Sequence, residues 1–176
     1  MAYKERDERL REAFLEAIAK FPQEALTYVD EMGVEHYLHR PRAWSPRGVS
    51  AQGWVQGRRY GRTGIVAGLC GKRAVAPMQY EGTMDTALFE FWFDGMLLPG
   101  LQRGCVIVMD NARFHRKAVL CEMAQRRGCF VLFLPPYSPD LNPIEKFWAW
   151  LKARLRKVLP YFDSLNGAIK DCFNAI

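Results

Sequence analysis

Long apolar runs are missing from this 176-residue sequence. A helix needs about 20 consecutive apolar residues to cross a bilayer, and the runs here are far shorter. The first residues, MAYKERDERLREAF, are charged and do not resemble a secretion signal. We therefore expect a cytoplasmic protein without a membrane partner. With 49% hydrophobic and 25% charged residues, the chain suits one folded domain and not a disordered one.

Paired cysteines are missing too. Five cysteines are scattered along the chain without any CxxC spacing. This argues against a disulfide framework and against a zinc site, and it fits a reducing compartment. We interpret them as core or surface thiols: Cys70, Cys105, Cys121, Cys129 and Cys172.

Acidic residues are absent from position 36 to position 80, although residues 1–36 carry nine of them against five basic residues. The acid-free stretch carries eight Lys and Arg residues, and a second basic series lies within 146–157. Such a stretch suits a polyanion, whereas the simpler alternative is a basic surface that only aids solubility. We predict DNA contacts at Arg40, Arg42, Arg47, Arg58, Arg59, Arg62, Lys146, Lys152 and Arg156.

The first half of the chain predicts a helix, three strands and a second helix. ERLREAFLEAIAKF has apolar residues at helical spacing and ends at Pro22, which predicts a linker helix within residues 1–25. ALTYVDEMGVEHYL predicts a strand broken by Gly33, and GWVQGRR and TGIVAGLCGKRAVAPMQYEG predict its two antiparallel partners. MDTALFEFWFDGMLL predicts a helix capped by Thr83 or Asp85.

The second half alternates strands with helices. CVIVMD and CFVLFLPP are apolar runs typical of buried parallel strands. Helices are expected in KAVLCEMAQRRG, which Gly128 ends, from Pro143 onward, and in SLNGAIKDCFNAI. The order indicates an α/β fold, a mixed five-stranded sheet flanked by helices, in a domain over residues 26–176.

Three acids occupy positions where such folds carry their chemistry. Asp110 ends the strand CVIVMD and precedes Asn111, so both should lie at the carboxyl edge of the sheet. Glu145 follows the next strand and the stiff proline loop PPYSPDLNP, with 34 residues between it and Asp110. Asp30 closes the apolar part of the first strand, and its neighbour Glu31 should point to the opposite face.

Carboxylates that gather at one point repel one another. Two of them about 5 Å apart repel by roughly 3 kcal/mol at an effective dielectric near 20. A divalent cation would offset this repulsion, and oxygen-only ligands favour Mg²⁺ or Mn²⁺ over zinc. Paired ions about 3.5–4 Å apart serve phosphoryl transfer in two-metal sites. If the acids gather, the sequence predicts a site for two such ions.

Each acid also has a structural alternative. Glu145 lies three residues after Asn142, where it would complete a capping box at the helix start. Asp110 could instead cap the next helix. Asp85 and Asp94 compete for the position of the first acid.

Other polar and aromatic residues near the acids have two interpretations. His115 is most simply a packing or hydrogen-bonding residue. If functional, His115 would contact phosphate or support an acid, as Asn111 would, because no Ser or Cys stands beside it as a nucleophile. Trp150 should face Lys146 and Arg154, either for base stacking, for a protein interface or as an incidental exposed side chain.

These residues together resemble the catalytic domain of DDE transposases, in the bacterial insertion-sequence branch of the Tc/mariner superfamily. The matching segments are YVDEMGV, GTMDTALFEFWFDGMLLPGL, VIVMDNARFH and FLPPYSPDLNPIEKFWAWLK, with RAWSPRG after the first strand. The resemblance implies a ribonuclease-H-like fold in which Asp30, Asp110 and Glu145 bind two Mg²⁺ ions. It also favours Asp30 over Asp85 and Asp94.

The resemblance further implies DNA cleavage and strand transfer. Water would attack a phosphodiester at each transposon end, and the freed 3′-hydroxyl would attack double-stranded target DNA, typically at a TA dinucleotide. No covalent enzyme intermediate is needed. Paired-end cutting implies a homodimer. Relatives carry N-terminal helix-turn-helix domains, which residues 1–25 are too few to form, so an upstream reading frame could encode that protein.

Two other interpretations stay open. A non-catalytic DNA-binding or dimerisation module would bind DNA but not Mn²⁺. Another ribonuclease-H-like nuclease, such as a resolvase, would cut DNA without transferring a strand.

Overall fold

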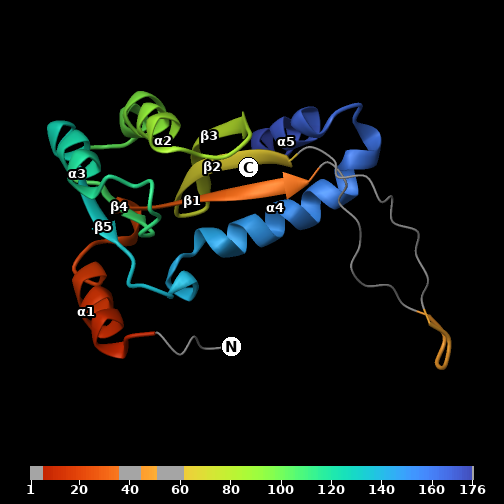
Figure 1. Ribbon diagram of the computed structural model, residues 1–176, viewed down its shortest axis with the longest axis horizontal. Helices are drawn as coiled ribbons and strands as arrows, with labels where there is room; N and C mark the ends of the chain where they lie inside the picture. The colour runs from red at the N-terminus through yellow and green to blue at the C-terminus, as the bar shows by residue number, and fades with distance from the viewer. Residues whose placement is uncertain (1–5, 36–44, 51–61, 176) are drawn as a thin grey trace.

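Strand β1 is the central strand of a mixed five-stranded sheet, in the order β3-β2-β1-β4-β5 (Figure 1). The structure, a computed structural model, describes residues 6–35, 45–50 and 62–175. Strand β2 is antiparallel to β1 and β3, whereas β4 is parallel to β1 and β5. The strands are β1 Leu26–Glu35, β2 Arg62–Cys70, β3 Arg73–Glu81, β4 Val106–Met109 and β5 Phe130–Phe133. This mixed sheet is the one that the sequence predicts.

The second and third strands differ from the prediction. Both form within residues 62–81, where the sequence predicts one strand, and the expected strand at GWVQGRR lies outside the described residues. Cys70 pairs with Arg73, so only Gly71 and Lys72 form the turn. Gly71 has φ +59°, a left-handed conformation that suits two-residue hairpin turns. The prediction missed this turn because Gly-Lys is a weaker turn signal than Asn-Gly.

The prediction that Gly33 breaks the first strand is wrong. The strand continues through Gly33, which pairs directly with Gly64 of β2. The guanidinium of Arg62 occupies the space where a Cβ on Gly33 would stand, and the ring of Tyr80 does the same at Gly64. These glycines therefore make room for side chains that cross the sheet.

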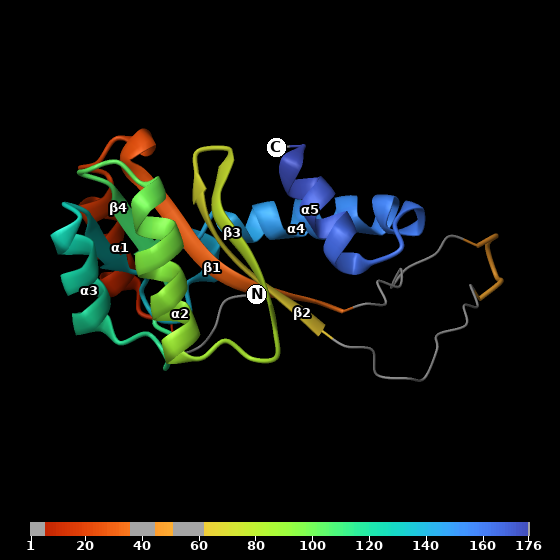
Figure 2. The same cartoon turned by 90° about the horizontal axis from the view of Figure 1, so that it is seen from above.

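Helices cover both faces of the sheet (Figures 1 and 2). On one face, α1, α4 and α5 contribute to a core with alternate residues of β1, including Tyr28 and Met32. On the other face, α2 and α3 pack with Val29 and the centre of β4. No helix in the described ranges is long and apolar enough to span a membrane. The helices are α1 Glu8–Ile18, α2 Thr86–Trp92, α3 Lys117–Arg126, α4 Ile144–Val158 and α5 Leu165–Asn174.

Helix α2 continues into two irregular turns, a π-helix at Phe93–Leu97 and a 3₁₀ helix at Leu98–Gly100. Of its two predicted caps, Asp85 is the one used, because its carboxylate accepts a hydrogen bond from the backbone of Leu88 at 2.8 Å. Asp85 therefore has a structural task away from the proposed acids.

Strand β5 is more exposed than predicted. Phe130 is 56% exposed, and the three following residues are only half-buried. The reason is position, since β5 is the last strand of the sheet beside β4. An apolar run does not distinguish an edge strand from a central one.

Helix α1 forms where the sequence predicts it and packs against the domain. Phe14 belongs to the core around α4. The buried guanidinium of Arg11 donates two hydrogen bonds to Asp140 in the proline loop, at 3.0 and 2.7 Å. Bidentate pairs of this kind fix geometry well, so α1 steadies the loop. The division into a linker at 1–25 and a domain at 26–176 stays a prediction.

Candidate catalytic site

Asp30 lies on the face of the sheet that α4 covers. Successive residues of a strand point to opposite faces, so Asp30 shares its face with Tyr28 and Met32, whereas Glu31 points the other way, as predicted. The indole nitrogen of Trp148, a buried residue of α4, donates a hydrogen bond to Asp30 Oδ2 at 3.0 Å. The two residues lie 118 positions apart, so no local sequence pattern predicts this contact.

Asp110 follows β4 at the carboxyl edge of the sheet. Its Oδ1 accepts a hydrogen bond from the backbone of Ala112 at 3.0 Å and lies 3.2 Å from Nδ1 of His115. The neighbouring Asn111 donates a hydrogen bond from its amide to the carbonyl of Leu134 at 2.6 Å. Asn111 thereby joins the end of β4 to the start of the proline loop.

Glu145 lies in the first turn of α4, but the predicted capping box is absent. No side chain caps α4. The buried Asn142 instead donates its amide to the carbonyl of Val29, the residue before Asp30, at 3.3 Å. Because Asn142 joins the helix start to β1, Glu145 is left to face the pocket.

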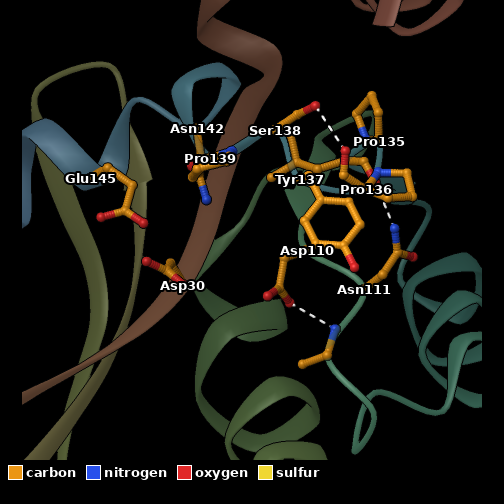
Figure 3. A pocket seen from close by; sticks show the side chains of 12 residues that line it. Asp30, Asp110, Asn111, Pro135, Pro136, Tyr137, Ser138, Pro139, Asn142 and Glu145 are labelled. Carbon is orange, nitrogen blue, oxygen red and sulfur yellow. Dashed lines mark hydrogen bonds between the residues drawn. The ribbon is translucent and has the colours of Figure 1, made fainter. Parts of the chain in front are cut away.

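The three acids line one pocket of about 370 Å³ (Figure 3). The carboxylates of Asp30 and Glu145 turn toward one another in this view. The proline loop forms the remaining wall, where Tyr137 holds a left-handed backbone with φ +54°. Asp94, the other rival for the first acid, is exposed on the turn after α2 and does not line this pocket. The pocket therefore contains the three acids that the sequence analysis singled out.

The acids do not surround one point. In the ranges that the structure describes, no three His, Cys, Asp or Glu side chains lie close enough to hold a single metal ion. Asp110 is turned toward His115 and the backbone of Ala112, whereas Asp30 and Glu145 face one another. The pocket therefore presents a carboxylate pair and a third carboxylate apart from it.

Burial and charge set the protonation of these groups. Burial, followed by the charges of Glu31 and Glu145, raises the pKa of Asp30 to about 7. Burial raises the pKa of Asp110, but the hydrogen bonds from His115 and Ala112 together outweigh burial and bring this pKa below its usual range. Burial would lower the pKa of His115, yet Asp110 and Glu31 raise it to about 9. At neutral pH, His115 is thus a buried cation and Asp30 is half protonated.

The sequence from residue 25 to residue 166 matches the family described as DDE superfamily endonuclease. The chain belongs to this family. The Tcb1 transposase of Caenorhabditis briggsae is 36% identical to this chain over 81 residues, which make up 44% of this chain and 30% of that protein. The Tc1 transposase of Caenorhabditis elegans is 36% identical over 77 residues, 44% of this chain and 26% of that protein. The chain therefore spans less than a third of each relative.

Solved structures identify the fold. The Mos1 mariner paired end complex with Mn superposes with a TM-score of 0.70 and 18% identity, over 100% of this chain and 58% of that chain. The Mos1 transposase catalytic domain with Raltegravir and Mn gives 0.62 and 14%, over 99% and 96% of the two chains. The catalytic core of BIV integrase gives 0.53 and 12%, over 85% and 81%. The chain has the ribonuclease-H-like fold that its sequence resemblance implies.

Only five of the nine predicted DNA contacts lie in the described residues. Arg40, Arg42, Arg58 and Arg59 lie outside the described residues. Arg47, Arg62 and Lys146 are exposed, and Lys152 and Arg156 are half-buried on α4. None of these five lines the pocket of the acids. The guanidinium of Arg154 lies 5.9 Å from the ring of Trp150, as predicted.

Proposed function

We propose that this chain is the catalytic domain of a transposase, which cuts DNA at transposon ends and joins the freed 3′-hydroxyl to target DNA. The observation that carries the proposal is the shared pocket of Asp30, Asp110 and Glu145 in a member of the DDE endonuclease family. We propose these three as the catalytic and metal-binding residues.

The chemistry of the pocket fits Mg²⁺ or Mn²⁺. Its acidic ligands are all oxygen donors, which these ions prefer. Within the described residues, neither Asp30 nor Glu145 forms an ion pair with a basic side chain. Burial is the largest cause of the raised pKa of Asp30, and the nearby charges of Glu31 and Glu145 raise it further. We propose that two Mg²⁺ or Mn²⁺ ions share the three acids, as the family resemblance implies.

The residues of the chain divide the work. Bound Mg²⁺ or Mn²⁺ would supply the positive charge that phosphoryl transfer requires. Asp30 and Glu145 would provide carboxylate ligands for these ions from one part of the pocket, and Asp110 from another. The proline loop, fixed by Arg11 and Asn111, would keep the pocket wall in place while DNA binds.

The partners follow from the same proposal. Double-stranded DNA is the substrate, with TA as the expected target, and a homodimer would hold two transposon ends. Three of the similar solved structures are paired-end complexes of Mos1, which supports DNA binding and pairing. An upstream-frame helix-turn-helix protein would recognise the end sequence.

Product analysis tests the proposal. Purified protein incubated with transposon-end DNA, TA-containing plasmid and Mn²⁺ is expected to give nicked ends and plasmid-joined products on a sequencing gel, and none in EDTA. Cleavage without joined products would favour the resolvase-like alternative. DNA binding without cleavage, together with no Mn²⁺ binding in calorimetry, would identify a non-catalytic module.

DNA affinity should depend steeply on salt. If six to ten phosphates are contacted, the association constant falls by about 10³–10⁵ between 50 and 200 mM salt. Arg47→Gln should lower the slope of log affinity against log salt by about 1. Lys20→Gln is the matched control, because Lys20 lies in the acid-rich N-terminal region. Fluorescence anisotropy across salt concentrations measures both, and a flat response would contradict phosphate binding.

A further inference from the structure

Glu31 lies beside Asp30 in sequence but contacts a different part of the site. It points to the face of the sheet opposite Asp30, where its carboxylate is only 14% exposed. Its Oε1 lies 3.5 Å from Nε2 of His115, and Nδ1 of the same ring lies 3.2 Å from Oδ1 of Asp110. His115 thus bridges two carboxylates, one from the pocket and one outside it.

The ring of His115 is fixed in place. Its side chain is 2% exposed, and its centroid lies 4.2 Å from the ring of Phe89 and 4.4 Å from that of Phe114. Phe89 is itself fully buried. A ring packed between two aromatic side chains has little freedom to rotate, so the direction of Nδ1 toward Asp110 depends on the packing and on what Nε2 contacts.

The far nitrogen of His115 has Glu31 as its counter-charge. In the described part of the chain, neither His115 Nε2 nor Glu31 Oε1 has a hydrogen-bond partner, although both are buried. Their separation of 3.5 Å is within ion-pair range but longer than a good hydrogen bond. Buried polar atoms without a hydrogen-bond partner destabilise a fold, so their presence here calls for a functional explanation.

We propose that Glu31 is a positioning residue, which through His115 holds the carboxylate of Asp110 in the orientation that the reaction uses. Strand β1 would then fix the positions of two of the three acids. It carries Asp30, and its next residue, Glu31, orients Asp110 through His115. The inference rests on the proposed function. Partners behind metal ligands commonly change metal affinity or activity by about 10–100-fold.

Kinetics of single and double variants test this role. Glu31→Gln should lower kcat for cleavage by about 10–100-fold, with KM for DNA changed less than about two-fold and Mn²⁺ binding weakened in calorimetry. The double variant Glu31→Gln/His115→Gln should be no slower than His115→Gln alone, because Glu31 acts through the ring. If the two single effects multiply instead, Glu31 acts independently and the proposal is overturned. Glu35→Gln, an exposed acid on the same strand, is the control and should behave as the unaltered protein.

Two further measurements separate this inference from the proposed function. The ¹⁵N–¹H spectrum of the His115 ring, assigned by comparison with His115→Gln, should shift in Glu31→Gln without any metal or DNA present. An unchanged ring spectrum would overturn the positioning role of Glu31 even if the protein cleaves DNA. If the unaltered protein does not cleave DNA, the proposed transposase function fails, but the effect of Glu31 on the ring can still be measured. If Glu31→Gln fails to fold, Glu31→Asp takes its place in the test. Aspartate keeps the negative charge, but its side chain is one methylene shorter and its carboxylate lies farther from His115. This variant should lower kcat at unchanged KM, and an unchanged kcat would count against the proposal.

Discussion

Asp110→Asn is expected to reduce cleavage of transposon-end DNA by more than about 100-fold, a larger loss than residues behind metal ligands usually cause. Asparagine keeps the shape of the side chain, and its oxygen can still accept the hydrogen bond from Ala112. It loses the charge that faces the pocket. The loss should appear in kcat with Mg²⁺ and with Mn²⁺, because a neutral amide is a weaker ligand for either ion.

A control and a folding check make this result specific. Asp85→Asn is the control, because Asp85 caps α2 and asparagine is an equally good cap. Its activity should stay within about two-fold. Thermal melting of Asp110→Asn shows whether the lost ion pair with His115 unfolds the chain. A folded Asp110→Asn protein that cleaves as fast as the control would remove Asp110 from the mechanism.

Local sequence patterns singled out these acids. Asp110 ends an apolar run, and Glu145 begins an amphipathic one. Alternation along β1 put Asp30 and Glu31 on opposite faces, which the structure confirms. These features depend on the short-range spacing of apolar residues, which can be recognised in the sequence because any strand or helix that buries one face shows it.

The parts that could not be predicted depend on contacts distant in sequence. Asn142 was expected to cap α4, but it binds the carbonyl of Val29, which lies 113 residues away. His115 packs against Phe89 and reaches Glu31, and no local pattern brings those residues together. Local propensity favours the cap, and tertiary contacts override it.

The separation of Asp110 from the other two acids was not predicted either. The sequence argument assumed that carboxylates gather at one point and need a cation. His115 supplies a positive charge from the protein for Asp110, whereas Asp30 is buried near the negative charges of Glu31 and Glu145. The acids of this pocket therefore differ in how far a neighbouring positive charge compensates them, and we expect their variants to differ in stability.

Asp30→Asn should stabilise the metal-free protein at pH 8 while abolishing activity. The pKa of Asp30 is about 7 in the folded protein, against an ordinary value of 3.8. The folded state therefore binds the proton more tightly than the unfolded chain, and stability falls as pH rises from about 4 to about 7. Each pKa unit corresponds to about 1.4 kcal/mol, so ionised Asp30 lowers the free energy of unfolding by as much as about 4 kcal/mol at pH 8.

Urea unfolding at pH 4 and pH 8, in EDTA and in Mg²⁺, measures this effect. In EDTA the variant should exceed the unaltered protein by about 2–4 kcal/mol at pH 8 and by little at pH 4. Groups that titrate in both proteins, such as His115, cancel in the comparison. Mg²⁺ at 100 times its dissociation constant should add about 2.7 kcal/mol to the unaltered protein and less to the variant. Asp94→Asn is the matched control, because Asp94 is exposed and away from the pocket. A variant less stable than the unaltered protein at pH 8 without metal would mean that burial and the neighbouring acids do not destabilise the ionised Asp30 carboxylate. The need for a cation at this pocket would then lose its physical basis.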